Sequence, residues 1–367
     1  MMKNKTLIAA IAIICISLNL TASDDIDMAR YMGSDIHALT PVEGYKSVIV
    51  SYRLVNDTID VFDIKEEELS SSTQNYSSIG DLDGFGLKAR YAPLESLLLQ
   101  LSLTKDSIEY GDGKLRNTHF EVFARKRLIS SRYTFFNGFA IDGGFVYDHG
   151  QKLSFTSAST IQSAIKNILQ ADKVTINSNK VVVKKGANTY ASLTSEPVYA
   201  SIDSMRDATV YLRAILEKKI TNYQLLNCYA KVGHTTISTK LRTNPELIAK
   251  AKSEGYEVET DLGRDEWTLA AGLTYSMEFH PGIDLMTEWG YRYEYYFRDS
   301  DIKERDYNHI LTADFTFVLD KEWSLHMGGR IMFSQLNGQI PYLYNRYSKT
   351  TFDHRYGYVY AGVGYEF

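Results

Sequence analysis

The sequence predicts an antiparallel β-barrel that spans a membrane, and three features indicate this fold. From Lys46 onward, apolar residues recur at every second position in blocks of about ten residues, the length that a tilted strand needs to cross a bilayer. The chain is rich in aromatic residues, with 27 Tyr, 16 Phe and 3 Trp, and it contains only six Pro. Aromatic girdles and proline-poor strands are typical of transmembrane barrels.

The first residues predict export from the cytoplasm. Lys3 and Lys5 precede an apolar run from Leu7 to Leu20, and small residues follow at 21–23. This order is typical of a cleavable signal peptide, which we assign to 1–23. The alternative, a membrane anchor, needs about 18 apolar residues, and this run is shorter. No later run is long and apolar enough for a spanning helix.

The remaining chain divides into a short periplasmic segment, 24–44, and a barrel, 45–367, with a long loop inserted at 148–206. Twelve alternating blocks are expected as strands, at 46–54, 85–91, 97–104, 120–128, 135–147, 207–217, 226–232, 267–279, 283–295, 311–319, 323–333 and 359–367. Ten or fourteen strands remain alternatives. A soluble β-sandwich is the other fold considered, but its strands would be shorter and its exposed faces less apolar.

The connections between the blocks give an independent check, because bacterial barrels have short periplasmic turns and longer outer loops. Short links are expected near Pro93 and Ser130 and at 218–221, 280–282 and 320–322. Long loops are expected at 56–83, 105–116, 148–206, 235–265, 298–307 and 336–352. Short and long links alternate throughout only if 207–217 is a strand; an amphipathic helix over 204–219 is the rival interpretation.

The last strand carries a motif of its own. Tyr360, Gly362, Tyr365 and Phe367 place a polar residue, a glycine and two aromatic residues at fixed distances from the C-terminus. This pattern resembles the C-terminal assembly signal of Gram-negative outer-membrane β-barrel proteins. The resemblance implies recognition by the barrel-assembly machinery and a location in the outer membrane, among its lipid and lipopolysaccharide. It indicates no narrower family.

Charged residues at inward positions of the strands are candidates for lining the lumen. The basic ones come mostly from the first seven strands, and the acidic ones cluster on strands eight to ten. A basic wall facing an acidic wall would orient polar solutes in a water-filled lumen; alternatively, the same charges pair across a filled interior. The candidates are Arg53, Lys88, Arg90, Arg125, Arg213, Lys231, Glu278, Asp284, Glu288, Arg292, Glu294, Asp314 and Arg330.

Inward glycines favour the open lumen over the filled interior. Six glycines fall at inward positions, and we expect them to leave space that a packed interior would fill. They are Gly86, Gly144, Gly272, Gly328, Gly362 and Gly364.

Three loops have patterns of their own. In 148–206 we expect a helix over 161–169 and a hairpin around 177–180. By analogy with general porins this third outer loop would narrow the pore; a surface lid or adhesive knob is the alternative. A second helix, which should roof the barrel, is indicated by Asn244 followed by Pro245. The acidic loop 56–83 is interpreted as solvated rather than as a divalent-cation site, so no metal is assigned.

These features predict a transport protein rather than an enzyme. No nucleophile or metalloprotease motif is present, His326 and His354 are expected to be lumen-facing fillers, and no cofactor is expected. The formal net charge of −5 gives no reason to expect nucleic acid. We expect a porin-like channel for passive passage of small hydrophilic solutes. The alternative is a closed barrel that binds or adheres through its outer loops. The oligomeric state is left open.

Overall fold

The structure is a computed structural model, and it describes residues 35–56, 79–110, 113–130, 135–279, 284–302, 305–334, 339–348 and 355–367. The signal peptide assigned to 1–23, the first part of the segment 24–44 and most of the acidic loop 56–83 lie outside these residues. Among the described residues, no helix has the length and apolar character needed to cross a membrane.

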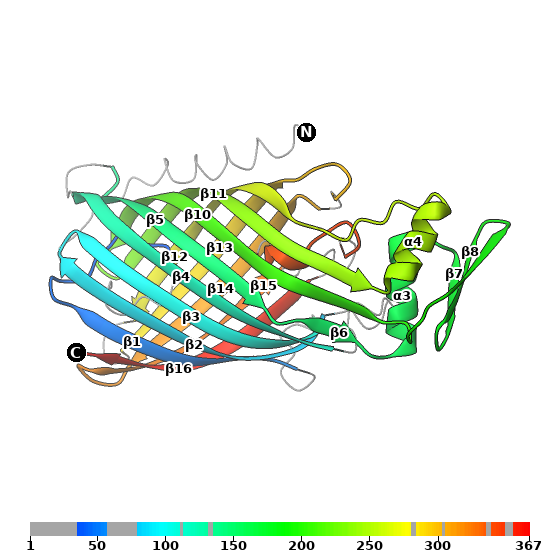
Figure 1. The fold of residues 1–367 in the computed structure, drawn as a ribbon. Coiled ribbons are helices and arrows are strands. Elements are labelled where there is room, and N and C mark those ends of the chain that lie inside the picture. The colour runs from blue at the N-terminus through cyan, green and yellow to red at the C-terminus, as the bar shows by residue number, and fades with distance from the viewer. Residues whose placement is uncertain are drawn as a thin grey trace.

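Twelve antiparallel strands form a closed barrel, which Figure 1 shows from the side. β1 pairs with β2 and β16, and β10 pairs with β5 and β11, so the ring of strands closes on itself. The prediction of about twelve strands is therefore confirmed. The strands are β1 (Lys46–Val55), β2 (Ile79–Leu94), β3 (Leu97–Tyr110), β4 (Gly113–Ser130), β5 (Gly138–Gly150), β10 (Ala200–Thr221), β11 (Gln224–Thr243), β12 (Arg264–Phe279), β13 (Leu285–Phe297), β14 (Tyr307–Val318), β15 (Trp323–Met332) and β16 (Tyr356–Glu366).

The strand predicted at 207–217, on which the alternation of short and long links depends, is present. β10 contains the whole of 207–217 and pairs in register with β5 and β11, so a helix over 204–219 is wrong. The turn predicted at 218–221 is also wrong, because β10 continues to Thr221 and β11 begins at Gln224. The end of the barrel that carries this turn is called the short-turn end below, and the opposite end the loop end.

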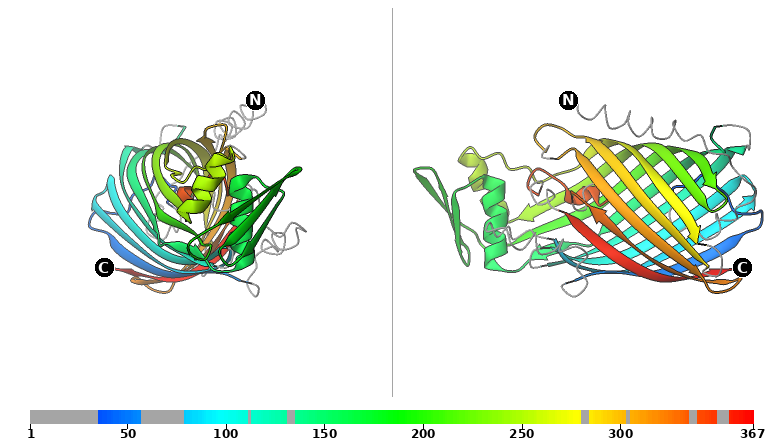
Figure 2. Two further views of the ribbon diagram at one scale, coloured as in Figure 1. Left: turned by 45° about the vertical axis from the view of Figure 1, so that its right-hand side comes forward. Right: turned by 180° about the vertical axis from the view of Figure 1, so that it is seen from behind.

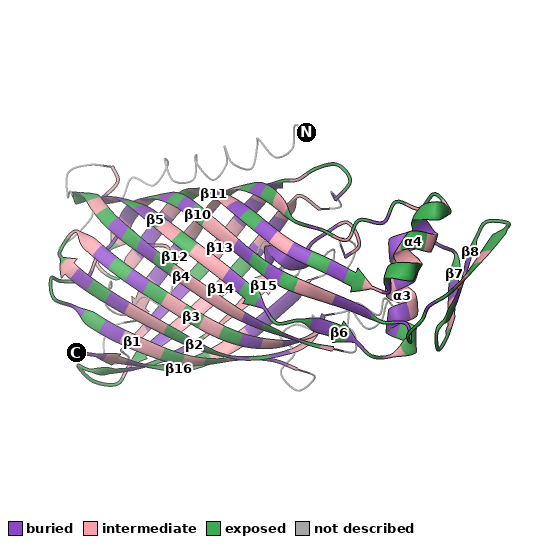
Figure 3. Ribbon diagram, viewed as in Figure 1, coloured by how far each residue is buried: buried purple, intermediate pink, exposed green. Residues whose placement is uncertain are grey.

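The outer surface of the barrel is apolar, and buried and exposed residues alternate along each strand (Figure 3). Aromatic side chains gather near both ends. At the short-turn end the Trp323 and Tyr365 rings lie 4.8 Å apart, and at the loop end the Tyr295 and Phe297 rings lie 5.1 Å apart. An apolar band between two aromatic belts is the surface that a lipid bilayer requires.

Several strands extend past the predicted blocks at the loop end. β3 runs to Tyr110 and β4 starts at Gly113, so the loop expected at 105–116 is wrong. In the same way β11 continues to Thr243, which shortens the loop expected at 235–265. The extra pairing is stabilised from inside, because Ile108 and Leu115 face each other and both are buried.

A separate lobe stands beyond the loop end of the barrel (Figures 1 and 2). It consists of α3 (Ala158–Leu169), α4 (Pro245–Ser253) and a sheet of β7 (Lys173–Asn177), β8 (Lys180–Lys185) and β9 (Asn188–Leu193). Short β6 (Leu153–Phe155) leads into it and pairs with β10. The predicted helix and hairpin are confirmed, whereas β9 was not foreseen.

The second predicted helix, α4, also belongs to this lobe. It begins at Pro245 after Asn244 as predicted, and Gly255 follows it with a φ of +80°, a left-handed conformation that glycine adopts readily. Ala251 of α4 lines the same small apolar cavity as Leu169 of α3 and Val183 of β8. The expectation that this helix roofs the barrel is therefore wrong, because its apolar face packs within the lobe.

Candidate functional site

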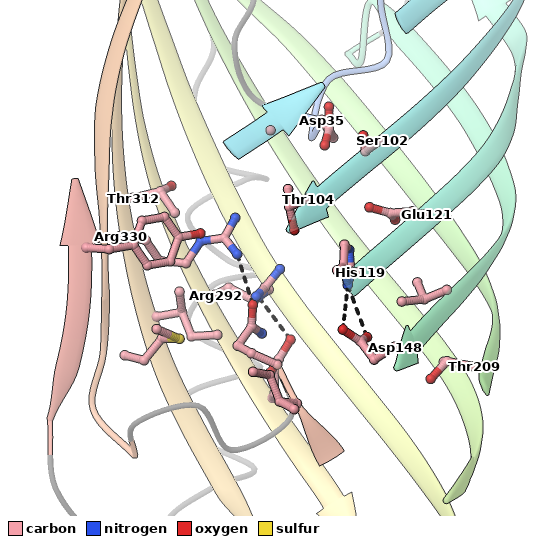
Figure 4. A pocket seen from close by; sticks show the side chains of 18 of the residues that line it. Asp35, Ser102, Thr104, His119, Glu121, Asp148, Thr209, Arg292, Thr312 and Arg330 are labelled. Carbon is pink, nitrogen blue, oxygen red and sulfur yellow. Dashed lines mark hydrogen bonds and ion pairs between the residues drawn. The ribbon is translucent and has the colours of Figure 1, made fainter. Parts of the chain in front are cut away.

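A cavity of about 350 Å³ lies inside the barrel (Figure 4). All twelve strands contribute side chains to its wall. Asp35 and Ile36 bound it toward the short-turn end, and Gln339 and Ile340 bound it toward the loop end. Its size is at the lower end of the range for small-molecule sites.

Residues 35–44, which precede β1, cover the short-turn end of this cavity from inside. Lys88 Nζ lies 3.1 Å from Asp35 Oδ1, and Arg125 Nη2 donates to the Asp35 carbonyl oxygen at 2.6 Å. The Ala38 backbone N–H donates to Asn227 Oδ1 at 3.2 Å, and Ala38 is buried. The described part of the segment predicted as periplasmic, residues 35–44, thus enters the barrel.

The last loop of the chain covers the loop end. It contains the short helix η3 (Pro341–Leu343), seen in red-orange within the barrel outline in Figure 2. Tyr342 is fully buried there: its N–H donates to Asp207 Oδ2 at 3.3 Å, its Oη donates to Asn117 Oδ1 at 2.8 Å, and its carbonyl accepts from Thr239 Oγ1 at 2.9 Å. Burial, with carboxylates nearby, raises the pKa of Tyr342 well above its usual value, so the phenol remains a donor.

The constriction was predicted in the wrong loop. Among the described residues of 148–206, only Asp148 lines the cavity, and Asp148 belongs to β5. Many apolar residues of the third loop, among them Ile161, Ile165, Val181 and Val183, are buried in the lobe and none of them lines the cavity. The last loop enters instead, because Ile340, Tyr342 and Leu343 are buried against the inner wall at the loop end.

The structure divides the thirteen predicted lumen residues into two groups. Five have other positions than the cavity wall: Arg90, Arg125 and Glu288 are buried inside the barrel, Glu278 is half-buried near the end of β12, and Asp284 is exposed before β13. The eight that line the cavity are Arg53, Lys88, Arg213, Lys231, Arg292, Glu294, Asp314 and Arg330.

Acidic partners on the early strands were missed in the sequence. Asp142 accepts from Arg125 Nε at 2.8 Å and from Arg213 Nε at 2.8 Å, and it is fully buried. Asp106 lies 2.8 Å from Arg53 Nη1. The strand alternation contained a signal, since Asp142 and Asp148 flank inward Gly144 at spacings of two and four residues.

Consequently the charges do not separate into a basic early wall and an acidic late wall. Arg53, Arg125 and Arg213 are neutralised by acids one or two strands away. Lys88 and Arg90 instead pair with Asp35 of the segment before β1. Figure 4 shows Arg292 and Arg330, from β13 and β15, opposite Glu121, His119 and Asp148 from β4 and β5. Early and late strands therefore both contribute cations and carboxylates to the cavity wall.

Tyrosine rings fill much of the space above the inward glycines. A Cβ atom on Gly144 would lie 2.3 Å from the Tyr211 ring, and one on Gly272 would lie 2.6 Å from the Tyr229 ring. In each case glycine and tyrosine face each other on neighbouring strands. The expectation that these glycines leave open space is wrong at these positions, because each accommodates a large ring.

The terminal motif spans both faces of β16. Tyr360 points inward and donates to Asp314, whereas Tyr365 packs on outward Trp323 and Phe367. Gly362 lies against Ser51 of β1, where a Cβ would meet the Ser51 Cβ at 2.9 Å. The motif residues thus close the barrel seam between β16 and β1. Their role in assembly stays a prediction.

The cavity offers binding by charge and hydrogen bonds. His326, expected as a filler, is buried between Thr316 Oγ1 at 3.0 Å and Ser324 Oγ at 2.9 Å, while His354 lies outside the described residues. Among the residues that the structure describes, no group of three or more His, Cys, Asp and Glu is placed to hold a metal ion. The arrangement can enclose a small polar solute.

Comparisons with known proteins give only distant similarities. No protein-family description matches the sequence, and no curated protein matches it. Among solved structures, the translocator domain of the autotransporter NalP from Neisseria meningitidis is 10% identical with a TM-score of 0.47, covering 99% of this chain and 96% of that chain. The KdgM porin is 12% identical with a TM-score of 0.35, covering 87% of this chain and 99% of that chain. The CymD monoaromatic hydrocarbon channel is 8% identical with a TM-score of 0.40, covering 95% and 98%. Identities and TM-scores this low carry no function from these proteins to this chain.

Proposed function

We propose that this chain is an outer-membrane channel for small hydrophilic solutes, closed at both ends by its own segments in the state described. The observation that supports it most is the charged cavity that all twelve strands surround. Charges are costly to bury, and an interior with no role in passage would be filled with apolar side chains at lower cost. In this proposal the signal peptide directs export and the assembly machinery inserts the barrel.

The direction of the barrel follows from its connections. Short turns face the periplasm and long loops face outward in bacterial barrels, so the lobe lies outside the cell, among lipopolysaccharide. The segment 35–44 then closes the periplasmic side. The last loop closes the outer side, and it is the gate of the channel.

The closed state should be dominant. Ile340, Tyr342, Leu343 and Tyr344 of the last loop are all buried. Each large buried side chain contributes about 1.5–3 kcal/mol, so spontaneous displacement of the loop should be rare. The sequence led us to expect passive passage through a permanently open pore. We propose instead that solutes pass only when the last loop leaves the barrel.

The test is single-channel conductance in a planar bilayer. Replacing 339–348 by a Gly-Ser linker in a chain that also lacks 24–44 should give discrete steps, while the wild type gives few. A second variant with Ile340→Ser and Leu343→Ser keeps the chain length and should give intermediate activity. Folding is checked by the heat-dependent shift in gel mobility. Folded protein without steps in either variant would refute the channel.

A second function is favoured by the lobe. Ile165, Val181 and Val183 are buried in it, none of its helices or strands lines the cavity, and it stands beyond the loop end of the barrel (Figure 1). We propose surface binding as the alternative function. Phe155 and Ala200 are directly opposite in an antiparallel pair, so 156–199 can be replaced by an Asn-Gly turn. If the lobe is the functional part, this variant loses attachment of barrel-bearing vesicles to host-cell surfaces and keeps the conductance of its parent.

A further inference from the structure

The lobe is basic, although the chain as a whole is acidic. From His149 to Ser195 the sequence contains six Lys, no Arg and one acidic residue, Asp172, whereas the whole chain has a formal net charge of −5. The Asp172 carboxylate accepts a hydrogen bond from the Gly186 backbone N–H at 2.6 Å. An excess of one charge on a folded unit creates a potential that attracts the opposite charge, so the lobe should attract anions.

Three of these lysines lie on one face of the lobe's sheet. Val181 and Val183 of β8 are buried and line the small apolar cavity of the lobe. Because side chains alternate along a strand, Lys180 and Lys184 point to the opposite face. Lys173 of β7 is directly opposite Lys184 in the register, and all three lysines are exposed. We call the face that these three lysines share the basic face.

The sheet itself gives no reason for this arrangement. Like charges directly opposite each other on neighbouring strands destabilise a sheet, as for Lys173 and Lys184. Lysines can protect edge strands from pairing, but β8 is the central strand of the three. Lys250 of α4 pairs with Glu254, whereas no carboxylate of the described residues lies within ion-pair distance of the three lysines. An anion bound from outside would relieve the repulsion.

The remainder of the basic face offers hydrogen bonds rather than stacking surfaces. Thr189 is directly opposite Lys184, and Asn177 is directly opposite Lys180. These two rows are four residues apart along β8, or about 13 Å. Tyr190, the one aromatic residue of β7, β8 and β9, belongs to the inner face and lines the apolar cavity. Bases of single-stranded nucleic acid would find no ring to stack on.

We propose that the basic face binds an anionic polysaccharide of a surface outside the cell. An extended chain with sulfates or carboxylates on successive sugars can place one anion between Lys173 and Lys184 and another at Lys180. Its hydroxyl groups can bond Thr189 and Asn177. Figures 1 and 2 show the β7–β8 hairpin as the part of the lobe farthest from the barrel, so a polymer on another surface can reach it. The site rests on the surface-binding function proposed above, since it names the class of partner.

The test measures binding of labelled polysaccharides to the full-length mature protein in vesicles of uncharged lipid. Heparin supplies sulfates, alginate supplies carboxylates, and dextran is the uncharged control. Heparin and alginate should bind, and dextran should not. The affinity for heparin should fall as the salt concentration rises, because salt screens exposed charges.

Variants assign the binding to the basic face. Lys173→Gln combined with Lys184→Gln should weaken heparin binding about 25-fold, or about fivefold for each lysine lost. Lys184→Glu makes the same change in net charge and should weaken binding as much, while its new pairing with Lys173 supports the sheet. The control combines Lys240→Gln with Lys252→Gln, since both lysines are exposed on β11 and α4, away from the basic face. It should bind heparin like the wild type, and resistance of the lobe to added protease checks folding in every variant.

Several results would overturn the site. These are absence of heparin binding by the wild type, equal losses in the Lys173 and Lys184 double variant and the control, or equal binding of dextran. Double-stranded DNA bound as tightly as heparin, or binding to lipopolysaccharide vesicles without binding to heparin, would assign the basic face to another anion and overturn it too.

Cell attachment separates this result from the parent proposal. Attachment that needs the lobe, without heparin binding, leaves surface binding and removes the polysaccharide site. Heparin binding without attachment leaves the site and removes the surface-binding function.

Discussion

Replacing Asp142 by Asn tests whether the short-turn end of the barrel is sealed from water. The Asp142 carboxylate receives two hydrogen bonds from Arg125, at 2.8 and 3.0 Å, and two from Arg213, one from Nε at 2.8 Å and one from Nη2. Asp142 and Arg125 both have 0% exposed side chains. Asn keeps the shape of Asp but removes the charge, and it turns an amide N–H₂ group toward guanidinium donors.

The expected loss of stability follows from this burial. Breaking a buried ion pair by removing one partner costs about 3–5 kcal/mol, because the remaining charge is left without compensation. Here one substitution leaves two guanidinium groups without their shared counterion. With a urea dependence of about 1–3 kcal/mol per M, the unfolding midpoint should fall by at least about 1 M.

The assay is urea unfolding of the refolded protein in lipid vesicles. Trp267, Trp289 and Trp323 are the three tryptophans, all exposed on the outer face of the barrel, so their fluorescence reports loss of lipid contact. Asp265→Asn is the control, since Asp265 is exposed and accepts one hydrogen bond, from Thr236 at 2.7 Å. It should change the free energy of unfolding by less than about 0.5 kcal/mol.

A midpoint for Asp142→Asn equal to that of the control would refute the reasoning. It would mean that water already solvates Arg125 and Arg213, and that the segment 35–44 does not seal this end. Deleting 24–44 gives a further check. In that background the cost of Asp142→Asn should shrink, because water then reaches the arginines.

Two further predictions concern packing and the gate. Gly144→Ala should destabilise the barrel by about 1–3 kcal/mol, because the added Cβ would meet the Tyr211 ring. Gly143→Ala is the control and should be nearly neutral, because its Cβ would meet only Leu212 at 3.7 Å. Equal urea midpoints for the two variants would contradict the contact between the Tyr211 ring and Gly144. Tyr342→Phe leaves Asn117 Oδ1 without its donor and should weaken the closed loop by about 1–2 kcal/mol, seen as faster cleavage of that loop by added protease. An unchanged cleavage rate would show that the loop does not depend on this hydrogen bond.

The strands were predictable because alternation is local. Successive side chains of a strand point to opposite faces, so apolar residues at every second position mark the lipid-facing side. Val210 and Leu212 on one strand and Leu325 and Met327 on another show this alternation, which is visible within ten residues of sequence. The helix after Asn244 was equally predictable, since proline and glycine mark its ends. The third loop's helix and first hairpin follow from short-range periodicity too.

The candidate site was predictable only in part. Inward positions follow from the alternation along each strand. The sequence alone therefore identifies Arg53, Lys231, Arg292 and Arg330 as lumen residues, and all four line the cavity. The carboxylates that pair with such cations could not be predicted, because the order and stagger of the strands decide which carboxylate lies next to which cation. Arg213 meets Asp142 across 71 residues of sequence.

By itself the sequence determined the class of fold, an expected count of about twelve strands, and which strand positions face lipid or the interior. Only the tertiary structure decided which loop enters the barrel. Tyr342 donates a hydrogen bond to Asn117, 225 residues away in the sequence, and no local pattern in the last loop indicates that it enters the barrel. The reason is physical: a loop enters the barrel when its apolar side chains have no other partners. The third loop buries its own in a lobe, and the last loop, too short for that, buries its own against the inner wall.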